Sequence, residues 1–376
     1  MQQPHIVFCA NSAWNLYNFR LPLMKSLAQR GFRVTAVAPS DEYAEKIRTA
    51  GFEFHALNLS RKSTNLLTDL KTLKMLRKLY KKLAPDVVCH FTIKPNIYGT
   101  VAAAKLGIPA VNNISGLGTV FITHSPVTRL VKFLYRYSQR KASKVFFQNS
   151  DDQTEFIRHA LVPGEISGVL PGSGIDLNQY RVEKNGELES EVRSTCRFLL
   201  IGRILRDKGV LEYFDAAKII TAERRDARFM LLGPIDENNH TGIDHTTLEA
   251  LLQPGAVEYR GETDDVRSFI AAADCIVLPS YREGTPRTLL EAAAMGKPLV
   301  ATDVPGCRQV VNDGVNGYLC SPYSSESLAG AIRKILQLTP AERRQMGLKG
   351  REKMEREYDQ QLVFDAYRSA IEEALA

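Results

Sequence analysis

The feature that most constrains the fold is a repeated alternation of short apolar runs with segments of helical periodicity along the 376-residue chain. Runs of this kind are typical of buried parallel strands, and the segments between them supply the helical crossovers that parallel strands need. The sequence therefore predicts an α/β fold made of βαβ units. In the first half we expect strands at residues 5–10, 33–38, 53–57, 86–90, 110–113 and 144–148.

A polar, glycine-containing stretch interrupts the alternation at residues 171–194, and a new apolar run follows it directly. We therefore predict two doubly wound, Rossmann-like domains, residues 1–170 and 171–359. Because such sheets bind ligands at the carboxyl ends of their strands, we expect a cleft between the domains to hold the site. In the second half we expect strands at residues 197–201, 228–232, 257–259, 275–278 and 298–301.

The two halves carry opposite net charges. Residues 1–170 contain 23 Lys and Arg against 10 Asp and Glu, a net charge of +13, and the remainder carries −6. A basic half indicates an anionic partner, which is a lipid surface, a phosphorylated acceptor or nucleic acid. Residues 71–82 and 129–144 interleave cations with apolar side chains, and residues 120–122 add an apolar wedge. Such helices either lie on an anionic membrane or pack their apolar sides on the sheet.

Several classes of protein are disfavoured by what the sequence lacks. No apolar run approaches the roughly 20 residues that span a bilayer, and the first residues show no secretory signal, so we expect a cytosolic protein. The six cysteines are scattered without metal-ligand spacing. No D-x-D motif occurs, so we expect neither a metal nor another cofactor. We interpret the isolated histidines, including His90, as structural.

Residues 278–291, LPSYREGTPRTLLE, predict a strand end, a polar turn and a helix. The unpaired N–H groups and the dipole at a helix start favour an anion such as a diphosphate. Glu283 lies in the turn, and Glu291 follows eight residues later, about two turns into the helix. One carboxylate would accept from sugar hydroxyls and the other from ribose hydroxyls. The alternative is that both are ordinary helix charges.

Residues 201–209, IGRILRDKG, also follow a predicted strand. Arg203 can fork onto phosphate oxygens, and Lys208 can add a compact positive charge to the same group. Together they would neutralise a leaving nucleotide diphosphate, whereas the alternative is a pair of ordinary surface cations.

Here the motifs identify a family. The segments IGRILRDKG, LPSYREGTPRTLLEAAAMGKP and ATDVPGCRQVVNDGVNG closely resemble the retaining glycosyltransferases of family 4, which have the GT-B fold and an E-x7-E motif. The segments FTIKPNIYGTVAAAKLGIPAVNNISGLGTVF and VFFQNSDDQ look like bacterial enzymes that build polysaccharide or protein-linked glycans on undecaprenyl diphosphate. The resemblance implies two Rossmann-like domains facing across a cleft, with residues 360–376 crossing back onto the first.

The resemblance also implies an activity. It is that of a metal-independent, retaining transferase that moves a hexose or N-acetylhexosamine from a UDP-sugar to an undecaprenyl-diphosphate-linked saccharide, with N-acetylgalactosamine as our first choice. By resemblance the catalytic residues are Glu283, Lys208 and Arg203, which contact the donor sugar and the diphosphate, while Glu291 contacts the ribose. The other implied donor-binding residues are Gly202, Gly284, Thr285, Pro286 and Arg287, with Arg260 and Val266 in a loop that flanks the base.

The chain departs from the family pattern at two places in its first half. The turn that we expect at residues 11–20 lacks the usual glycine pair, and residues 113–116 replace a histidine that often touches the sugar. We predict that the acceptor is bound there and in two loops that follow first-domain strands. The predicted acceptor-binding residues are Asn11, Asn18, Arg20, Arg61, Lys94, Asn113 and Ser115, with Arg61 and Lys94 on the acceptor diphosphate.

With a lipid-linked acceptor implied, the basic first half favours an anionic membrane as the partner. We therefore expect a peripheral protein on the inner face of the plasma membrane. An enzyme like the UDP-N-acetylglucosamine 2-epimerases, which process the donor without an acceptor, is the alternative, and the E-x7-E segment disfavours it. A nucleic-acid-binding module that uses residues 71–82 is disfavoured because no recognised nucleic-acid motif accompanies the basic residues.

Overall fold

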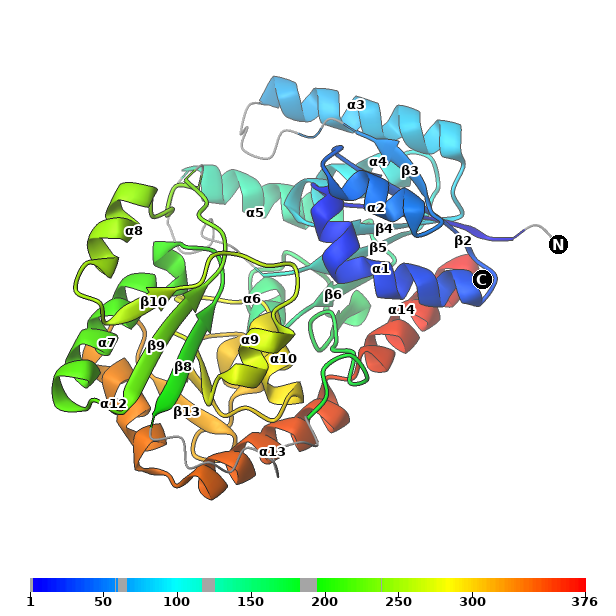
Figure 1. Ribbon diagram of the computed structural model, residues 1–376. Helices are drawn as coiled ribbons and strands as arrows, with labels where there is room; N and C mark the ends of the chain where they lie inside the picture. The colour runs from blue at the N-terminus through cyan, green and yellow to red at the C-terminus, as the bar shows by residue number, and fades with distance from the viewer. Residues whose placement is uncertain (1–2, 58, 60–65, 117–125, 183–194, 238) are drawn as a thin grey trace. The chain divides into compact units, whose positions relative to one another are not determined.

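The computed structural model describes residues 3–57, 59, 66–116, 126–182, 195–237 and 239–376 (Figure 1). The chain divides into two compact units. The first comprises Met1–Ser173 and Gln361–Ala376, and the second comprises Gly174–Gln360. The boundary therefore falls three residues after the predicted one, and each unit has its own parallel sheet.

The sheet of the first unit has the order β3-β2-β1-β4-β5-β6-β7, and every neighbouring pair is parallel. Six strands fall where the sequence predicts them. The three-residue β7 was not predicted, because a short run that contains Gly168 gives no strand signal. The strands are β1 His5–Cys9, β2 Arg33–Ala38, β3 Glu53–Ala56, β4 Val87–Phe91, β5 Ala110–Ile114, β6 Lys144–Phe147 and β7 Ser167–Val169.

Helices cover both faces of this sheet, as parallel sheets require. The helices α1 and α14 pack on one face and α3 and α4 on the other, while α5 and α6 cover the side of β6. The α-helices are α1 Ala13–Gln29, α2 Tyr43–Thr49, α3 Leu66–Leu83, α4 Thr100–Ala104, α5 Pro126–Gln139, α6 Ser150–Arg158 and α14 Gln360–Leu375. A π-helix, η1 Pro95–Gly99, leads into α4, and a 3₁₀ turn, η3 Gly164–Ile166, precedes β7.

The expectation that residues 11–20 form a turn was wrong. Only Ala10, Asn11 and Ser12 connect β1 to α1, because Ser12 caps the helix by accepting a hydrogen bond from Asn15 N at 3.2 Å. A serine cap of this kind starts a helix at once. Asn18 and Arg20 therefore lie on α1 instead of in a loop.

The two basic stretches, for which both membrane docking and packing on the sheet were open, differ from each other. Helix α3 buries Leu76 and Tyr80 against the sheet, so most of its apolar side is part of the core. Helix α5 ends at Gln139, five residues before the predicted end, and leaves Leu130, Phe133 and Tyr137 exposed by 38%, 61% and 49%. None of the helices within the described residues has the length and apolar character needed to span a bilayer.

The sheet of the second unit has the order β10-β9-β8-β11-β12-β13 and is also parallel throughout. Five strands match the predicted positions. The sixth, β13, was not predicted. It begins with Gly317, where a Cβ would lie 2.1 Å from the Leu299 carbonyl oxygen. The strands are β8 Cys196–Ile201, β9 Ala227–Leu232, β10 Val257–Tyr259, β11 Cys275–Leu278, β12 Leu299–Thr302 and β13 Gly317–Cys320.

Two apolar clusters fill the two faces of this second sheet. Helices α7, α8 and α12 pack on one face, and α9, α10 and α11 pack on the other. The helices are α7 Val210–Glu223, α8 His245–Leu252, α9 Arg267–Ala272, α10 Arg287–Ala294, α11 Cys307–Val310, α12 Ser325–Gln337 and α13 Pro340–Glu357, with a 3₁₀ turn η4 at Arg206–Lys208.

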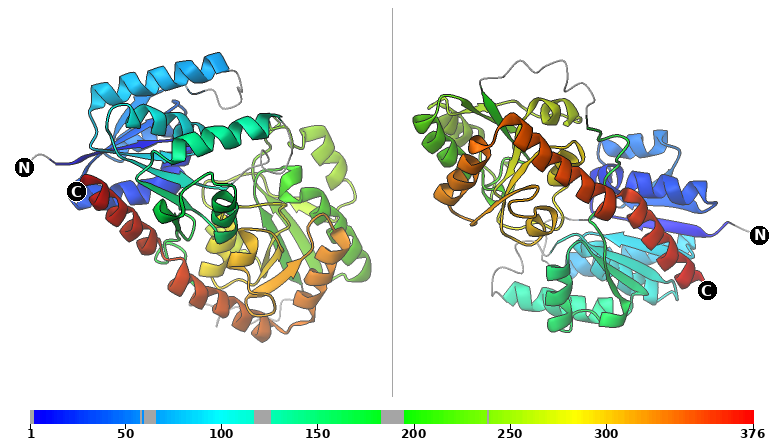
Figure 2. Two further views of the ribbon diagram at one scale, coloured as in Figure 1. Left: turned by 180° about the vertical axis from the view of Figure 1, so that it is seen from behind. Right: turned by 90° about the horizontal axis from the view of Figure 1, so that it is seen from below.

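The last helix, α14, returns to the first unit and forms part of its core. Figures 1 and 2 show it in red beside the sheet of that unit. Its Tyr367 is fully buried, with its ring centroid 5.1 Å from that of Phe146 and 6.1 Å from that of Phe91. The chain end is thus held by apolar burial, the main stabilising term in such contacts.

We predict that Tyr367→Ala lowers the free energy of unfolding by about 3–5 kcal/mol, because it leaves a cavity among these rings. Leu362→Ala, on the same helix but 46% exposed, should cost under about 0.5 kcal/mol. Urea unfolding of both variants measures the difference. Equal losses would show that α14 is not held by the core of the first unit.

Candidate active site

The second unit places its most polar loops at the point where the strand order changes direction. Strands β8 and β11 are neighbours there, and their carboxyl ends lead into the segments that contain Lys208 and Glu283. Lys208 Nζ donates a hydrogen bond to Glu283 Oε1, and the two side chains are 23% and 13% exposed. In sheets of this type such a switch point is the usual ligand site.

The carbonyl oxygen of Asp207 joins the two loops. It accepts hydrogen bonds from Ser280 Oγ at 3.0 Å and from Tyr281 N at 2.9 Å. Gly209, with a φ of 69°, lets the chain turn into α7 here, and a Cβ at this position would lie 2.1 Å from the Pro279 carbonyl oxygen. Lys208 is thereby held beside the Glu283 loop by backbone contacts.

A third loop, which follows β12, supports the Glu283 loop from another side. Glu283 N donates to the Pro305 carbonyl oxygen at 3.3 Å. A Cβ at Gly306, where φ is 85°, would lie 2.6 Å from the carbonyl oxygens of both Glu283 and Gly284. Gly284 and Thr285 continue to Pro286, which is the N-cap residue of α10. The predicted sugar and phosphate segment is thus a short loop that ends at a helix start.

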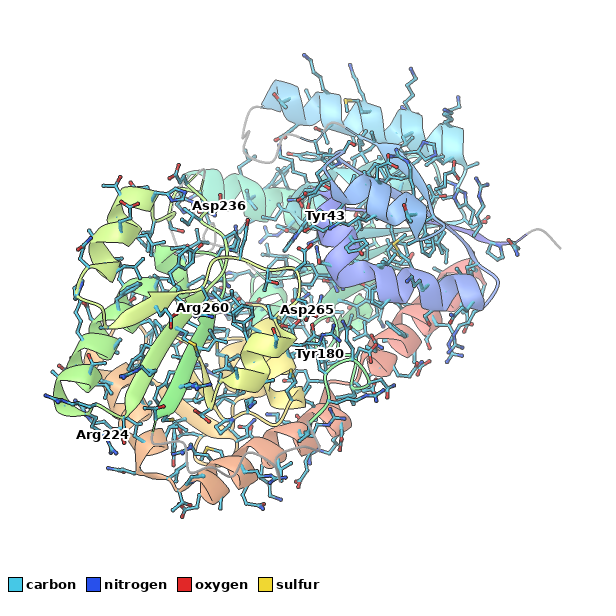
Figure 3. The ribbon with its side chains drawn as sticks, in the orientation of Figure 1. Tyr43, Tyr180, Arg224, Asp236, Arg260 and Asp265 are labelled. Carbon is cyan, nitrogen blue, oxygen red and sulfur yellow. The ribbon has the colours of Figure 1, made fainter. Side chains whose placement is uncertain are left out.

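Arg203 also lies at the carboxyl end of β8, directly after Gly202. Its Nη1 donates to Asp236 Oδ2 at 3.0 Å, and the arginine side chain is 51% exposed. Figure 3 shows Asp236 at the opposite end of the second sheet from Arg224, which precedes β9. Sequence reasoning missed Asp236, although its place after β9 follows the rule that identified the other site residues.

The prediction that Glu291 lies two turns into the helix was wrong, because α10 starts at Arg287 and Glu291 is its fifth residue. Glu291 is 7% exposed, and its Oε1 accepts from Arg287 Nε and from Tyr180 OH, each at 2.8 Å. Burial raises the pKa of Glu291, while the Arg287 guanidinium opposes the rise. Figure 3 shows Tyr180 beside α9 and α10. Nothing in the sequence pattern singled out Tyr180, because it lies in the segment between the domains.

The remaining predicted donor residues, Arg260 and Val266, lie in the segment between β10 and α9. Arg260 follows β10 and donates from Nη1 to Glu258 Oε1, and Val266 is the N-cap residue of α9. Strand β10 is separated from β8 by β9. The structure therefore brings Lys208 directly onto Glu283, whereas Arg260 follows the edge strand β10 and Val266 packs on the apolar cluster under α9 and α10. Within the described ranges, no three His, Cys, Asp or Glu side chains form a group that could hold a metal ion.

The first unit has its own pocket at the corresponding switch point, between β1 and β4. The pocket has a volume of about 260 Å³ and lies at the carboxyl ends of β1, β4 and β5. It contains three of the predicted acceptor residues. Its lining residues are Asn11, Thr92, Ile93, Lys94, Asn96, Ile114, Ser115, Gly116 and Tyr135.

Two buried polar atoms of this pocket lack hydrogen-bond partners within the described residues, which is typical of a binding site. In the part of the chain that the structure describes, Thr92 Oγ1 and Asn96 Oδ1 are buried and have no hydrogen-bond partner. Thr92 also has a φ of 74°, a conformation that a β-branched residue rarely adopts. Leaving such atoms unpaired is costly, and a bound polar molecule would satisfy them.

Lys94 is held in place by an acidic partner that sequence reasoning missed. Its Nζ donates to Asp69 Oδ1 at 2.8 Å, and Tyr98 OH donates to Asp69 Oδ2 at 2.7 Å. The Lys94 and Asp69 side chains are 15% and 12% exposed. The positive charge of Lys94 is therefore partly balanced by the Asp69 carboxylate on α3.

The other predicted acceptor residues lie outside this pocket. Arg20 is 2% exposed, with its guanidinium carbon 4.4 Å from the centre of the Phe91 ring, and its Nη2 donates to Asn113 Oδ1 at 3.4 Å. Arg20 and the buried Asn113 thus support the ends of β4 and β5 instead of facing solvent. Asn18 donates from Nδ2 to the Trp14 carbonyl oxygen on its own helix. Arg61 and residues 120–122 lie outside the described residues.

His90 is a structural residue, as expected. It is fully buried, with ring nitrogens 2.9 Å from Tyr80 OH and 2.9 Å from Asn112 Oδ1. Burial lowers its pKa to about 4, so the ring is neutral at pH 7.

Comparison with known proteins agrees with this geometry. Residues 192–353 match the family model "Glycosyl transferases group 1", and residues 5–149 match "Glycosyl transferase 4-like". The chain is 31% identical over 344 residues to the N,N'-diacetylbacillosaminyl-diphospho-undecaprenol alpha-1,3-N-acetylgalactosaminyltransferase of Campylobacter jejuni, covering 88% of this chain and 89% of that protein. The chain belongs to the group 1, family 4-like glycosyltransferases. The predicted family is confirmed.

Other relatives support the same membership. This glycosyltransferase is 26% identical over 282 residues to the Escherichia coli UDP-Gal:alpha-D-GlcNAc-diphosphoundecaprenol alpha-1,3-galactosyltransferase, covering 73% of this chain and 72% of that protein. A glycosyltransferase structure from Rickettsia africae matches with a TM-score of 0.81 and 16% identity, over 100% and 99% of the two chains. Anabaena HepE in complex with UDP and glucose matches with a TM-score of 0.78 and 18% identity, over 98% and 99%. These structures confirm the predicted fold of two Rossmann-like domains.

The role of Gly209 gives a test of the loop geometry. We predict that Gly209→Ala lowers the free energy of unfolding by about 1–2 kcal/mol through its positive φ and by a further 1–3 kcal/mol through the clash with Pro279. Gly255→Ala is a matched control, because Gly255 has a φ of 72° with nothing within 4 Å of its added Cβ. Chemical denaturation measures the free energy of unfolding of both variants. Equal losses would contradict the close approach of Gly209 to the Pro279 carbonyl oxygen.

Proposed function

We propose that this glycosyltransferase moves a sugar from a UDP-sugar to a saccharide carried on undecaprenyl diphosphate. The observation that carries the proposal is the Lys208–Glu283 pair at the switch point of the second sheet, beside the start of α10. In this pair Lys208 is a cation that can bind a diphosphate, and Glu283 is a carboxylate that can accept hydrogen bonds from sugar hydroxyls. The names of the Campylobacter and Escherichia relatives supply the acceptor class, and the Escherichia name supplies the donor class.

The paired state of Lys208 and Glu283 suits the site before the donor binds. Each side chain neutralises the other at low exposure, which avoids leaving a buried charge without a partner. A donor diphosphate would replace Glu283 as the partner of Lys208, and the released carboxylate would then accept from sugar hydroxyls. Arg203, half exposed on Asp236, would fork onto the same diphosphate.

In the proposed reaction the acceptor hydroxyl oxygen bonds to the anomeric carbon as the bond from that carbon to the UDP oxygen breaks. Attack occurs on the face that the UDP leaves, so the configuration is retained. The hydroxyl proton passes to the departing phosphate, which makes UDP. Because negative charge grows on that phosphate, Lys208 and Arg203 contribute most by stabilising it. These cations and the α10 start would do this without a metal ion.

We predict that Lys208→Ala lowers kcat by about 100- to 1000-fold with a smaller change in the KM for the UDP-sugar, because the lost interaction strengthens in the transition state. Glu283→Ala should also reduce turnover strongly. Lys218→Ala is the matched control, since Lys218 lies on α7 and pairs only with the exposed Asp215 among the described residues.

The measurement is UDP release and product formation with a panel of UDP-sugars, and lipid-linked diacetylbacillosamine and N-acetylglucosamine as acceptors. N-acetylgalactosamine is our first choice of donor sugar, because the Campylobacter relative transfers it. Release of UDP without acceptor would support the epimerase-like alternative. Full activity of the Lys208 and Glu283 variants would contradict the proposed site. Loss of activity on addition of a chelator would contradict the metal-free mechanism.

The pocket of the first unit is our proposed acceptor site. Thr92 Oγ1 and Asn96 Oδ1 would gain hydrogen-bond partners from a bound saccharide or phosphate, and Asn11, Ser115 and Lys94 line the same space. Since Asp69 already balances Lys94, this lysine would add hydrogen bonds more than net charge.

We also propose that α5 docks on the inner face of the plasma membrane. Leu130, Phe133 and Tyr137 form an exposed apolar stripe at helical spacing. Cations border the stripe, and Lys141 Nζ lies 4.8 Å from the centre of the Tyr137 ring. The bordering cations are Arg129, Lys132, Arg136, Arg140 and Lys141. An apolar stripe with a basic border suits an anionic lipid surface.

We predict that Phe133→Ser combined with Tyr137→Ser lowers the affinity for vesicles of phosphatidylglycerol and phosphatidylethanolamine by at least about tenfold, because two large apolar side chains no longer enter the interface. Leu70→Ser is the matched control, since Leu70 is 54% exposed on the basic helix α3. Vesicle co-sedimentation at two salt concentrations measures both. A larger loss with Leu70→Ser would assign docking to α3 instead.

A further inference from the structure

A pair of aromatic rings, one partly buried and one exposed, lies beside the Glu283 loop of the second unit. Tyr281 precedes Glu283 by two residues, and Tyr323 follows β13. Their ring centroids are 3.9 Å apart, with 40° between the ring planes. Tyr323 is 62% exposed, so its ring presents an aromatic surface to solvent, while Tyr281 is partly buried.

The position of Tyr281 is fixed by hydrogen bonds from its backbone N–H and from its side-chain hydroxyl. Its backbone N–H donates to the Asp207 carbonyl oxygen at 2.9 Å, and its OH donates to Glu212 Oε1 at 2.7 Å. Burial and the neighbouring Glu212 carboxylate raise the pKa of Tyr281, so the hydroxyl remains a donor. The ring is therefore rigidly connected to the loops that hold Lys208 and Glu283.

Tyr323 has an unusual backbone for a large residue. Its φ is 58°, in the left-handed region where glycine and asparagine are the favoured residues. The exposed ring adds little to the core, so packing does not explain why a tyrosine occupies this position. Strain of this kind clusters at binding sites, where a ligand contact explains it.

Two acidic residues, Glu212 and Asp207, lie near the Tyr281 hydroxyl. Glu212 forms no ion pair within the described residues, and its Oε2 is buried without a hydrogen-bond partner there. Asp207 adds a second acidic residue, while Lys208 is already paired with Glu283. A sugar ring would be attracted, because the negative face of an aromatic ring favours the C–H bonds on the apolar face of a pyranose.

We propose that Tyr281 and Tyr323 form a stacking subsite for a pyranose ring of the acceptor saccharide. The inference rests on the proposed transfer to a lipid-linked saccharide. Lys208 and Glu283, at β8 and β11, are assigned to the donor, whereas Tyr323 comes from β13 at the sheet edge, two strands away from β11. The pair therefore extends the site from the donor position toward that edge.

The test compares Tyr323→Asn with Tyr323→Phe in the transfer assay, with the full chain and the lipid-linked saccharide that the wild type uses. Asparagine tolerates the left-handed backbone but lacks the ring. We expect Tyr323→Asn to raise the KM for the acceptor by about 3- to 10-fold. The KM for the UDP-sugar should stay unchanged, and the melting temperature should stay equal or rise. Tyr323→Phe keeps the ring and should behave as wild type, and Val315→Asn, at a 51% exposed position of the same unit, is the surface control.

Three results would overturn the subsite. They are an unchanged acceptor KM in Tyr323→Asn, a rise confined to the KM for the UDP-sugar, and an equal rise in acceptor KM with Val315→Asn. A wild-type chain that transfers no sugar to any lipid-linked acceptor would instead refute the proposed function. The two failures are therefore distinguishable.

Discussion

The candidate active site depends on one close approach, between the loop after β8 and the loop after β11. The Asp207 carbonyl oxygen accepts two hydrogen bonds from the second loop, and Gly209 leaves room for the Pro279 carbonyl. Without this contact Lys208 would be an ordinary surface cation. With it, Lys208 meets Glu283 in a partly buried pair whose charges are balanced until a ligand separates them.

The two units use the same architectural rule for different chemistry. In each, polar residues gather where the strand order reverses, because the helices that follow two neighbouring strands lie on opposite faces and leave a crevice between their loops. In the second unit the crevice holds charged residues suited to a diphosphate. In the first it holds hydroxyl and amide groups with unsatisfied atoms, suited to a saccharide or a phosphate ester.

The basic character of the first half shows why charge counts alone mislead about surfaces. Helices α3 and α5 have similar composition, yet α3 buries Leu76 and Tyr80 in the core while α5 leaves Phe133 and Tyr137 exposed. Composition cannot distinguish these cases, because the difference lies in which side of each helix the sheet covers. Arg20 shows the same limit, since a residue that the motif placed in a loop is buried beneath Phe91.

The sequence by itself determined the α/β class, the family and the donor motif that contains Lys208 and Glu283. It also predicted eleven of the thirteen strands found within the described residues. These are local properties: apolar periodicity, turn chemistry and short motifs are written in consecutive residues. Tertiary structure alone decided the partners, because Asp236, Tyr180, Asp69 and Tyr323 are distant in sequence from the residues they contact. It also decided that Glu291 is buried and that α5 keeps an exposed apolar stripe, since burial depends on what the rest of the chain packs against each side chain.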